Sequence, residues 1–166
     1  FNAMLPVNER PEFTEGPEGF IHLFLVRGSV EHAQMRYIIR DHDRALLEKR
    51  KQYMLDAATL LNRRYGEGRV GLEINDQYYN MREMIEPVYE IVETAHDAML
   101  ALGIEPKIVP VRGGTDGSRL SFMGLPTPNI FTGGLYGHGK YEILPTRSLE
   151  RSVDVVLKII ELVAGK

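Results

Sequence analysis

The second half of the sequence contains only two short strand-like segments. This small number of strands is the strongest constraint on the fold of the chain. Residues 108–111 (IVPV) and 129–131 (NIF) alternate with helix-like segments over 87–102, 118–123 and 149–164. Such alternation is typical of a mostly parallel sheet covered by helices. Two strands do not form a stable sheet alone. We therefore expect the second half to be the last part of a larger α/β fold.

The first half predicts a more complete α+β unit. Two strand-like segments, 20–26 and 33–40, are separated by a Gly-Ser turn, which indicates a hairpin. Apolar residues then recur at helical spacing, so a helix capped by one of two aspartates is expected to end at Arg64. A third strand over 69–74 would complete a layer of strands with a helix on one face.

Composition favours a soluble globular protein and excludes several classes of partner. Apolar residues make up 43% and charged residues 26% of the chain. The net charge is −3 and no basic stripe is present, so no nucleic acid partner is expected. No apolar run approaches the ~20 residues that cross a bilayer, so no membrane partner is expected. The absence of cysteine excludes zinc–thiolate sites and fits a cytoplasmic location.

A glycine-rich loop, residues 113–117 (GGTDG), lies between a predicted strand and a predicted helix. Backbone N–H groups at such a position favour an anion. Ordinary helix capping by Thr115 or Asp116 is the alternative. The spacing is neither that of a P-loop nor that of a dinucleotide-binding motif.

A lone histidine, His138, lies in the glycine-rich sequence GGLYGHGKYE. The flanking glycines place its ring on a loop, where it can act as a metal ligand or proton carrier. Glu142 follows four residues later and can accept the imidazole N–H. A surface histidine in a flexible turn is the alternative.

Two arginines are candidates for contact with a carboxylate of a ligand. Arg40 ends the apolar strand in YIIRDHD, and its planar donors match a carboxylate at two points. Pairing with Asp41 or Asp43 is the alternative. Arg112 beside the glycine-rich loop has the same two interpretations. Residues 78–80 (YYN) are expected at a strand end and hinge, with ligand contact as the minor alternative.

Several motifs together resemble the tripeptide aminopeptidases of the dinuclear-zinc peptidase family, which also contains carboxypeptidase G-type enzymes and aminoacylases. They are RGGTDGSRLSFMGLPTPNIFTGG followed by HGKYE, and earlier FNAMLP, ERPE, YIIRDHD and YYNMRE. The resemblance covers the whole chain and is to the C-terminal part of such enzymes. It implies hydrolysis of the N-terminal residue from tripeptides by a zinc-activated water. A non-catalytic lid and dimerisation fragment, or an N-acyl-amino-acid amidohydrolase, is the alternative.

The resemblance also implies a domain division and partners. Residues 1–82 correspond to the later part of a ferredoxin-like α+β lid domain, and 83–166 to the C-terminal part of the α/β catalytic domain. The implied partners are a short peptide substrate, the missing N-terminal part of the catalytic domain, and a second copy in a homodimer.

By the same resemblance, His138 corresponds to the last zinc ligand. Arg40 corresponds to the lid arginine that grips the substrate carboxylate. The residues expected beside the substrate are Gly113, Gly114, Thr115 and, as a weaker candidate, Arg112.

The other ligands of the family's two Zn²⁺ ions and its general-base Glu precede the part that this chain resembles. The fragment alone is therefore expected to be inactive. The chain also departs from the usual motif, because Tyr136 stands where an Asn is usual and Gly137 where an aromatic residue is common.

Overall fold

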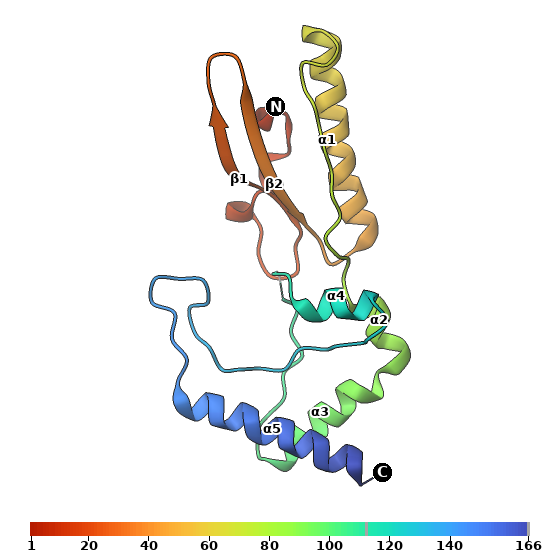
Figure 1. The fold of residues 1–166 in the computed structure, drawn as a ribbon, viewed down its shortest axis with the longest axis vertical. Coiled ribbons are helices and arrows are strands. Elements are labelled where there is room, and N and C mark those ends of the chain that lie inside the picture. The colour runs from red at the N-terminus through yellow and green to blue at the C-terminus, as the bar shows by residue number, and fades with distance from the viewer. Residues whose placement is uncertain (112, 166) are drawn as a thin grey trace. The chain divides into compact units, whose positions relative to one another are not determined.

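A computed structural model describes residues 1–111 and 113–165 and separates them into two units. Unit 1 contains Phe1–Asn80 and Pro110–Gly114, and unit 2 contains Met81–Val109 and Thr115–Lys166. Helices and a small antiparallel sheet make up the structure (Figure 1), which confirms the α/β class. The assignment of 1–82 to a lid and of 83–166 to a catalytic domain stays a prediction.

Unit 1 is built from the predicted hairpin and the predicted long helix. Strands β1 (Phe20–Gly28) and β2 (Ala33–Arg40) are antiparallel. Helix α1 (Arg44–Tyr65) begins after Asp43, whose side chain accepts a hydrogen bond from the backbone N–H of Leu46 at 2.9 Å. This bond satisfies one of the free donors at the helix start. Three single 3-10 turns precede the hairpin: η1 (Asn2–Met4), η2 (Val7–Glu9) and η3 (Pro11–Phe13).

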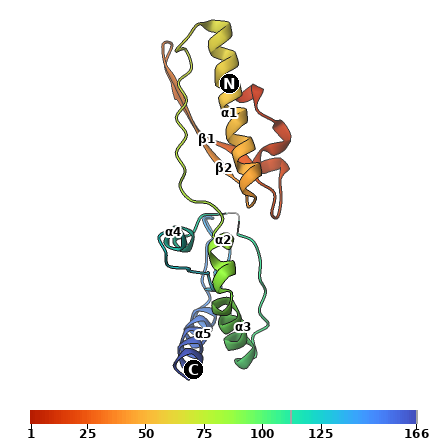
Figure 2. The same ribbon diagram turned by 90° about the vertical axis from the view of Figure 1, so that its right-hand side faces the viewer.

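The core of unit 1 is formed by residues of the N-terminal segment, the hairpin, α1 and the segment that follows α1, and Figure 2 shows how these segments run. Its buried residues are Leu5, Ile21, Met54 and Ala57. Leu72 and Ile74 pack against this core, but residues 69–74 form no strand, so the predicted third strand is wrong. Alternating apolar residues suffice for packing, whereas a strand also needs a neighbouring backbone. The sheet of the described residues pairs β1 only with β2.

Unit 2 is mainly helical. Its elements are α2 (Arg82–Ile85), η4 (Glu86–Val88), α3 (Glu90–Ala101), α4 (Asp116–Phe122) and α5 (Thr146–Ala164). Helices α3 and α5 pack together, with Ala98 and Val155 fully buried. Arg151 donates a hydrogen bond to the backbone carbonyl of Leu102, which links α5 to the end of α3.

The two strands predicted in the second half are not formed. Residues 108–111 and 129–131 have no regular secondary structure and belong to no sheet. Ile108 and Val109 are 72% and 66% exposed, although their sequence is that of a buried strand. Within the described residues no helix combines the length and hydropathy needed to cross a membrane.

Candidate functional site

Arg40 is the last residue of β2, where it pairs with Phe20. Its Nη2 donates a hydrogen bond to Oε1 of Gln77 at 3.1 Å, and its guanidinium carbon lies 4.9 Å from the ring centroid of Tyr78. No carboxylate forms an ion pair with Arg40 in the part of the chain that the structure describes. The guanidinium therefore keeps donors for a carboxylate of another molecule.

The two aspartates that follow Arg40 have other partners. The Asp41 carboxylate forms an ion pair with Arg50, and that of Asp43 caps α1. Arg50 Nε also lies 2.9 Å from Oε2 of Glu9. The sequence left open a pairing of Arg40 with Asp41 or Asp43, and the described part of the chain does not contain it.

The first part of the glycine-rich loop lies against Tyr78 within unit 1. A Cβ atom placed on Gly114 would be 1.6 Å from the Tyr78 hydroxyl oxygen, so position 114 accepts no side chain while the ring keeps its place. A Cβ atom on Gly113 would meet Val111 Cγ1 at 4.0 Å among the described residues. Arg112 lies outside the described residues.

Thr115, in unit 2, caps helix α4. Its Oγ1 accepts hydrogen bonds from the backbone N–H of Ser118 at 3.3 Å and from Nδ2 of Asn129 at 3.2 Å. A Cβ atom on Gly117 would lie 2.4 Å from the Thr127 carbonyl oxygen, so glycine lets α4 approach that segment. Of the two roles that the sequence left open for this loop, helix capping is the one seen.

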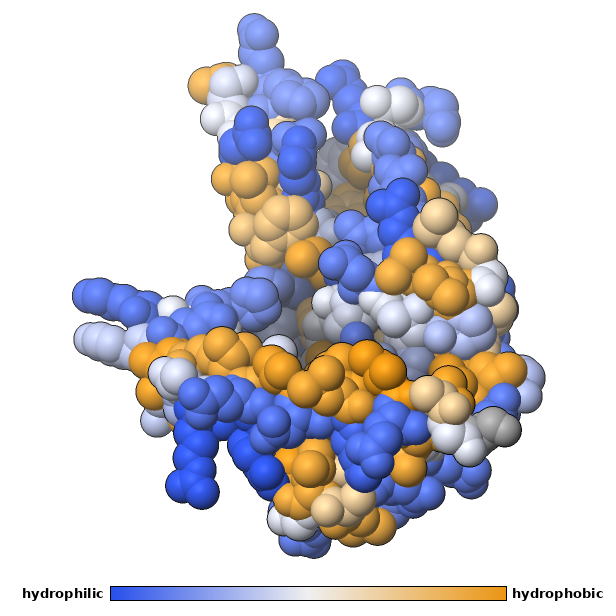
Figure 3. All heavy atoms as spheres, turned by 60° about the horizontal axis from the view of Figure 1, so that its bottom comes forward, coloured by the Kyte–Doolittle hydropathy of each residue, from blue (hydrophilic) through white to orange (hydrophobic). Residues whose placement is uncertain are grey.

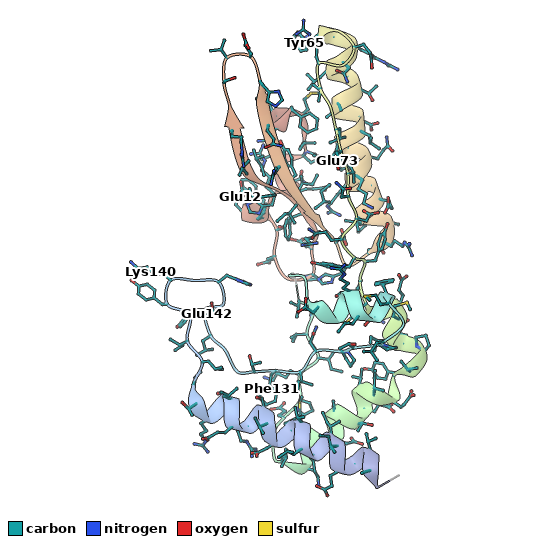
Figure 4. All side chains as sticks on the ribbon, viewed as in Figure 1. Glu12, Tyr65, Glu73, Phe131, Lys140 and Glu142 are labelled. Atoms are coloured by element: carbon teal, nitrogen blue, oxygen red, sulfur yellow. The ribbon has the colours of Figure 1, made fainter. Side chains whose placement is uncertain are left out.

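His138 occupies a turn that an isolated bridge between Leu135 and Ile143 closes. Its φ is +63° and that of Tyr136 is +57°, both in the left-handed region that most residues avoid. Glu142 accepts a hydrogen bond from the backbone N–H of His138, with Oε2 3.0 Å from the nitrogen. Figure 4 shows Glu142 on this exposed turn, which connects through an extended segment to α5.

The residues described here do not form a metal centre by themselves. No three His, Asp or Glu side chains of residues 1–111 and 113–165 gather closely enough to hold an ion. His138 has Glu142 as its neighbour, and that contact is through the backbone. A zinc site takes about four ligands, so the described residues do not complete one.

The sequence reasoning missed a charged cluster in unit 1. The ammonium of the buried Lys51 lies 2.6 Å from Asp76 and 2.7 Å from Glu48, and the Tyr79 hydroxyl lies 3.3 Å from it. Burial opposes the charge on Lys51, but hydrogen bonds with the two carboxylates outweigh it and raise the pKa of Lys51. The hydrogen bond from Lys51 lowers the pKa of Asp76. The one signal of this cluster in the sequence is the three-residue spacing of Glu48 and Lys51, which places both on one face of a helix.

Comparison with solved structures identifies the fold as that of tripeptidases and aminopeptidases. A tripeptidase from Staphylococcus aureus superposes with a TM-score of 0.63 at 21% identity, over 95% of this chain and 43% of that chain. Aminopeptidase PepT from Bacillus cereus gives 0.63 at 19% identity, over 98% and 43%. No protein-family model matches the chain.

Sequence comparison then gives a specific relationship, to peptidase T. The peptidase T of Clostridium novyi is 58% identical over 161 residues, which are 97% of this chain and 40% of the relative. That of Caldanaerobacter subterraneus is 58% identical over 163 residues, with 98% and 40% covered. The chain resembles the C-terminal part of peptidase T, as its motifs predict. It spans about 40% of the length of these relatives.

Proposed function

We propose that the chain forms the C-terminal part of a zinc-dependent aminopeptidase that removes the N-terminal residue from tripeptides. The observation that carries this proposal is the 58% identity to peptidase T over 97% of the chain. The Staphylococcus aureus neighbour is a tripeptidase, which supports the substrate class. The lack of cysteine supports a cytoplasmic enzyme.

In this proposal Arg40 binds the substrate carboxylate. Arg40 lies at the end of β2 and forms no ion pair with an acidic side chain of the described residues. Its guanidinium has the planar donors that recognition of a carboxylate needs. Gly113, Gly114 and Thr115 would also contact the substrate, with Arg112 as a further candidate. Thr115 keeps its capping bond in this role, so it would contribute mainly shape.

His138 would supply one zinc ligand, and the remaining ligands would come from residues that precede the part matched here. A non-glycine residue in the left-handed region is strained, and such strain gathers at functional sites. Zinc, when bound, supplies an activated water for hydrolysis. Since the described residues do not complete a metal centre, the chain alone would be inactive.

The proposed partner is the preceding part of the enzyme, which would cover an apolar face of α5. One face of this helix packs on α3 through Val155, while a second face is exposed. That exposed face contains Leu149, Val153, Val156, Leu157, Ile160 and Val163. Figure 3, in which the bottom of Figure 1 is turned forward, shows a band of hydrophobic side chains. A second copy, paired through unit 1 as lid, completes the proposed assembly.

A chimera tests the function. This chain replaces the aligned segment of Clostridium novyi peptidase T, and the product is assayed with a tripeptide and with an N-acyl amino acid. We expect release of the N-terminal residue from the tripeptide and no deacylation. His138→Ala is expected to lower bound zinc by about one of the two ions, because a lost ligand weakens a site strongly. A folded chimera that hydrolyses only the N-acyl amino acid, or neither compound, would contradict the proposal.

A further inference from the structure

We propose that Tyr78 is a positioning residue that holds the Arg40 guanidinium in place for a substrate carboxylate, and that position 114 is glycine because the Tyr78 hydroxyl occupies its side-chain space. This inference rests on the proposed function, since it gives Arg40 a substrate to hold. It adds a residue to the site, because the motifs point to Arg40 and the glycine-rich loop but leave Tyr78 as a hinge residue.

The first step is the contact between Arg40 and the ring. The guanidinium carbon lies 4.9 Å from the Tyr78 centroid, within the range of a cation–π interaction. Gln77 accepts one N–H of the same guanidinium at 3.1 Å. The Tyr78 ring thus covers one face of the Arg40 guanidinium, and the Gln77 amide occupies one of its N–H donors. The other N–H donors of the guanidinium stay available. A guanidinium fixed in this way loses less freedom when it binds a planar anion.

The second step is the contact between Tyr78 and the loop. A Cβ atom on Gly114 would be 1.6 Å from the hydroxyl oxygen and 2.4 Å from the carbon that carries it. Any other residue at 114 therefore displaces the ring, and with it the support of Arg40. One aromatic side chain joins two groups that the resemblance places beside the substrate, and all three residues belong to unit 1.

A purely structural cation–π pair is the competing explanation, and unit 1 contains a matched example. Arg64 lies 5.5 Å from the ring centroid of Tyr65 at the exposed end of α1. Tyr65 is 61% exposed and is labelled in Figure 4. Neither residue is a candidate for substrate contact, so Tyr65→Leu is the control for the loss of such a pair.

The test uses the chimera with a tripeptide and its C-terminal amide, which lacks the carboxylate. Tyr78→Leu is expected to raise KM for the free tripeptide about tenfold, with kcat within about twofold and the amide unchanged. Tyr78→Phe keeps the ring and should resemble the parent, whereas Gly114→Ala should resemble Tyr78→Leu. Equal effects of Tyr78→Leu on both substrates, or the same effect from Tyr65→Leu, would overturn the inference.

A second measurement does not need activity. The Arg40 Nε–H signal of the 166-residue chain is followed by NMR while the tripeptide is added. We expect a saturable shift in the parent and in Tyr65→Leu, and about tenfold weaker binding in Tyr78→Leu. An inactive chimera with these shifts would contradict only the proposed function. Equal binding by the parent and Tyr78→Leu, or no binding by the parent, would contradict the role of Tyr78.

Discussion

The carboxylate of Glu142 accepts a hydrogen bond from the backbone N–H of His138 at 3.0 Å. This bond closes the turn from inside, because both residues lie between the bridged pair Leu135 and Ile143. The sequence predicts a Glu142 contact with the imidazole instead, and that contact stays a prediction. In the described residues the Glu142 carboxylate thus contacts the backbone of His138.

Removal of the Glu142 carboxylate should loosen this turn. In Glu142→Ala we expect the His138 amide to exchange with solvent about tenfold faster, because a hydrogen bond to a charged acceptor is lost. Glu142→Gln keeps an acceptor and should show a smaller change. Hydrogen exchange followed by NMR measures both. Glu150→Ala on the exposed side of α5 is the control, and the same acceleration in that variant would argue against a specific contact.

The left-handed conformation of Tyr136 offers a stabilising substitution. A φ of +57° is costly for a residue with a bulky side chain and is tolerated better by Asn. Tyr136→Asn should slow exchange of the Gly139 amide, which donates to the Tyr136 carbonyl at 2.9 Å, by about fivefold. Tyr141→Asn removes a similarly exposed tyrosine and should leave the rate unchanged.

The Lys51 cluster predicts a defined response of stability to acid. The pKa of Asp76 is lower in the folded chain than in the unfolded chain, because Lys51 hydrogen bonds to it. Its ionised form therefore adds stability above about pH 4, the unfolded value, and this is lost as the pH falls through the lower folded value. Asp76→Asn should lower the free energy of unfolding at pH 7 by about 1 kcal/mol, since the carboxylate is half exposed.

Denaturant unfolding at pH 7, 5 and 3 measures the effect of Asp76→Asn. The variant should lose less stability than the parent over this range, because one of the groups that become protonated is gone. Asp97→Asn, whose carboxylate is 71% exposed beside His96, is the control and should keep the parent's slope. An unchanged slope in Asp76→Asn would contradict the prediction.

Sequence reasoning succeeded where a structure depends on neighbours in the chain. The hairpin and α1 follow from periodicity and from the Asp43 cap, so their ends were predicted within a few residues. The α5 helix begins at Thr146, three residues earlier than expected, and the Pro145 carbonyl accepts hydrogen bonds from the N–H groups of Ser148 and Leu149. Here local chemistry and packing favour the same conformation.

The same reasoning failed where the outcome depends on a partner. Residues 69–74, 108–111 and 129–131 have strand-like sequences but pair with no other strand in the described structure. An apolar pattern predicts that a strand can be buried, whereas pairing requires a second backbone. The same limit applies to the candidate site. Sequence motifs identify Arg40 and His138 as candidates. Contacts between residues far apart in the chain, such as that of Tyr78 with Arg40, are visible only in the structure.

The exposed face of α5 gives the last prediction, which concerns the partner proposed for this face. Val153, Val156 and Leu157 border a groove of about 320 Å³ beside the extended segment 130–132. Leu157 is 60% exposed. A charge at that position should therefore change the stability of the chain by less than about 0.5 kcal/mol.

Leu157→Glu should nevertheless weaken binding to the first three-fifths of Clostridium novyi peptidase T, because a charge would then be buried in an apolar contact. We expect a loss of about tenfold or more in affinity, measured by calorimetry with the two parts as separate chains. Glu150→Gln, an exposed change on the same helix, is the control and should keep the parent's affinity. Equal affinity of the parent and Leu157→Glu would show that this face of α5 stays in solvent in the assembled enzyme.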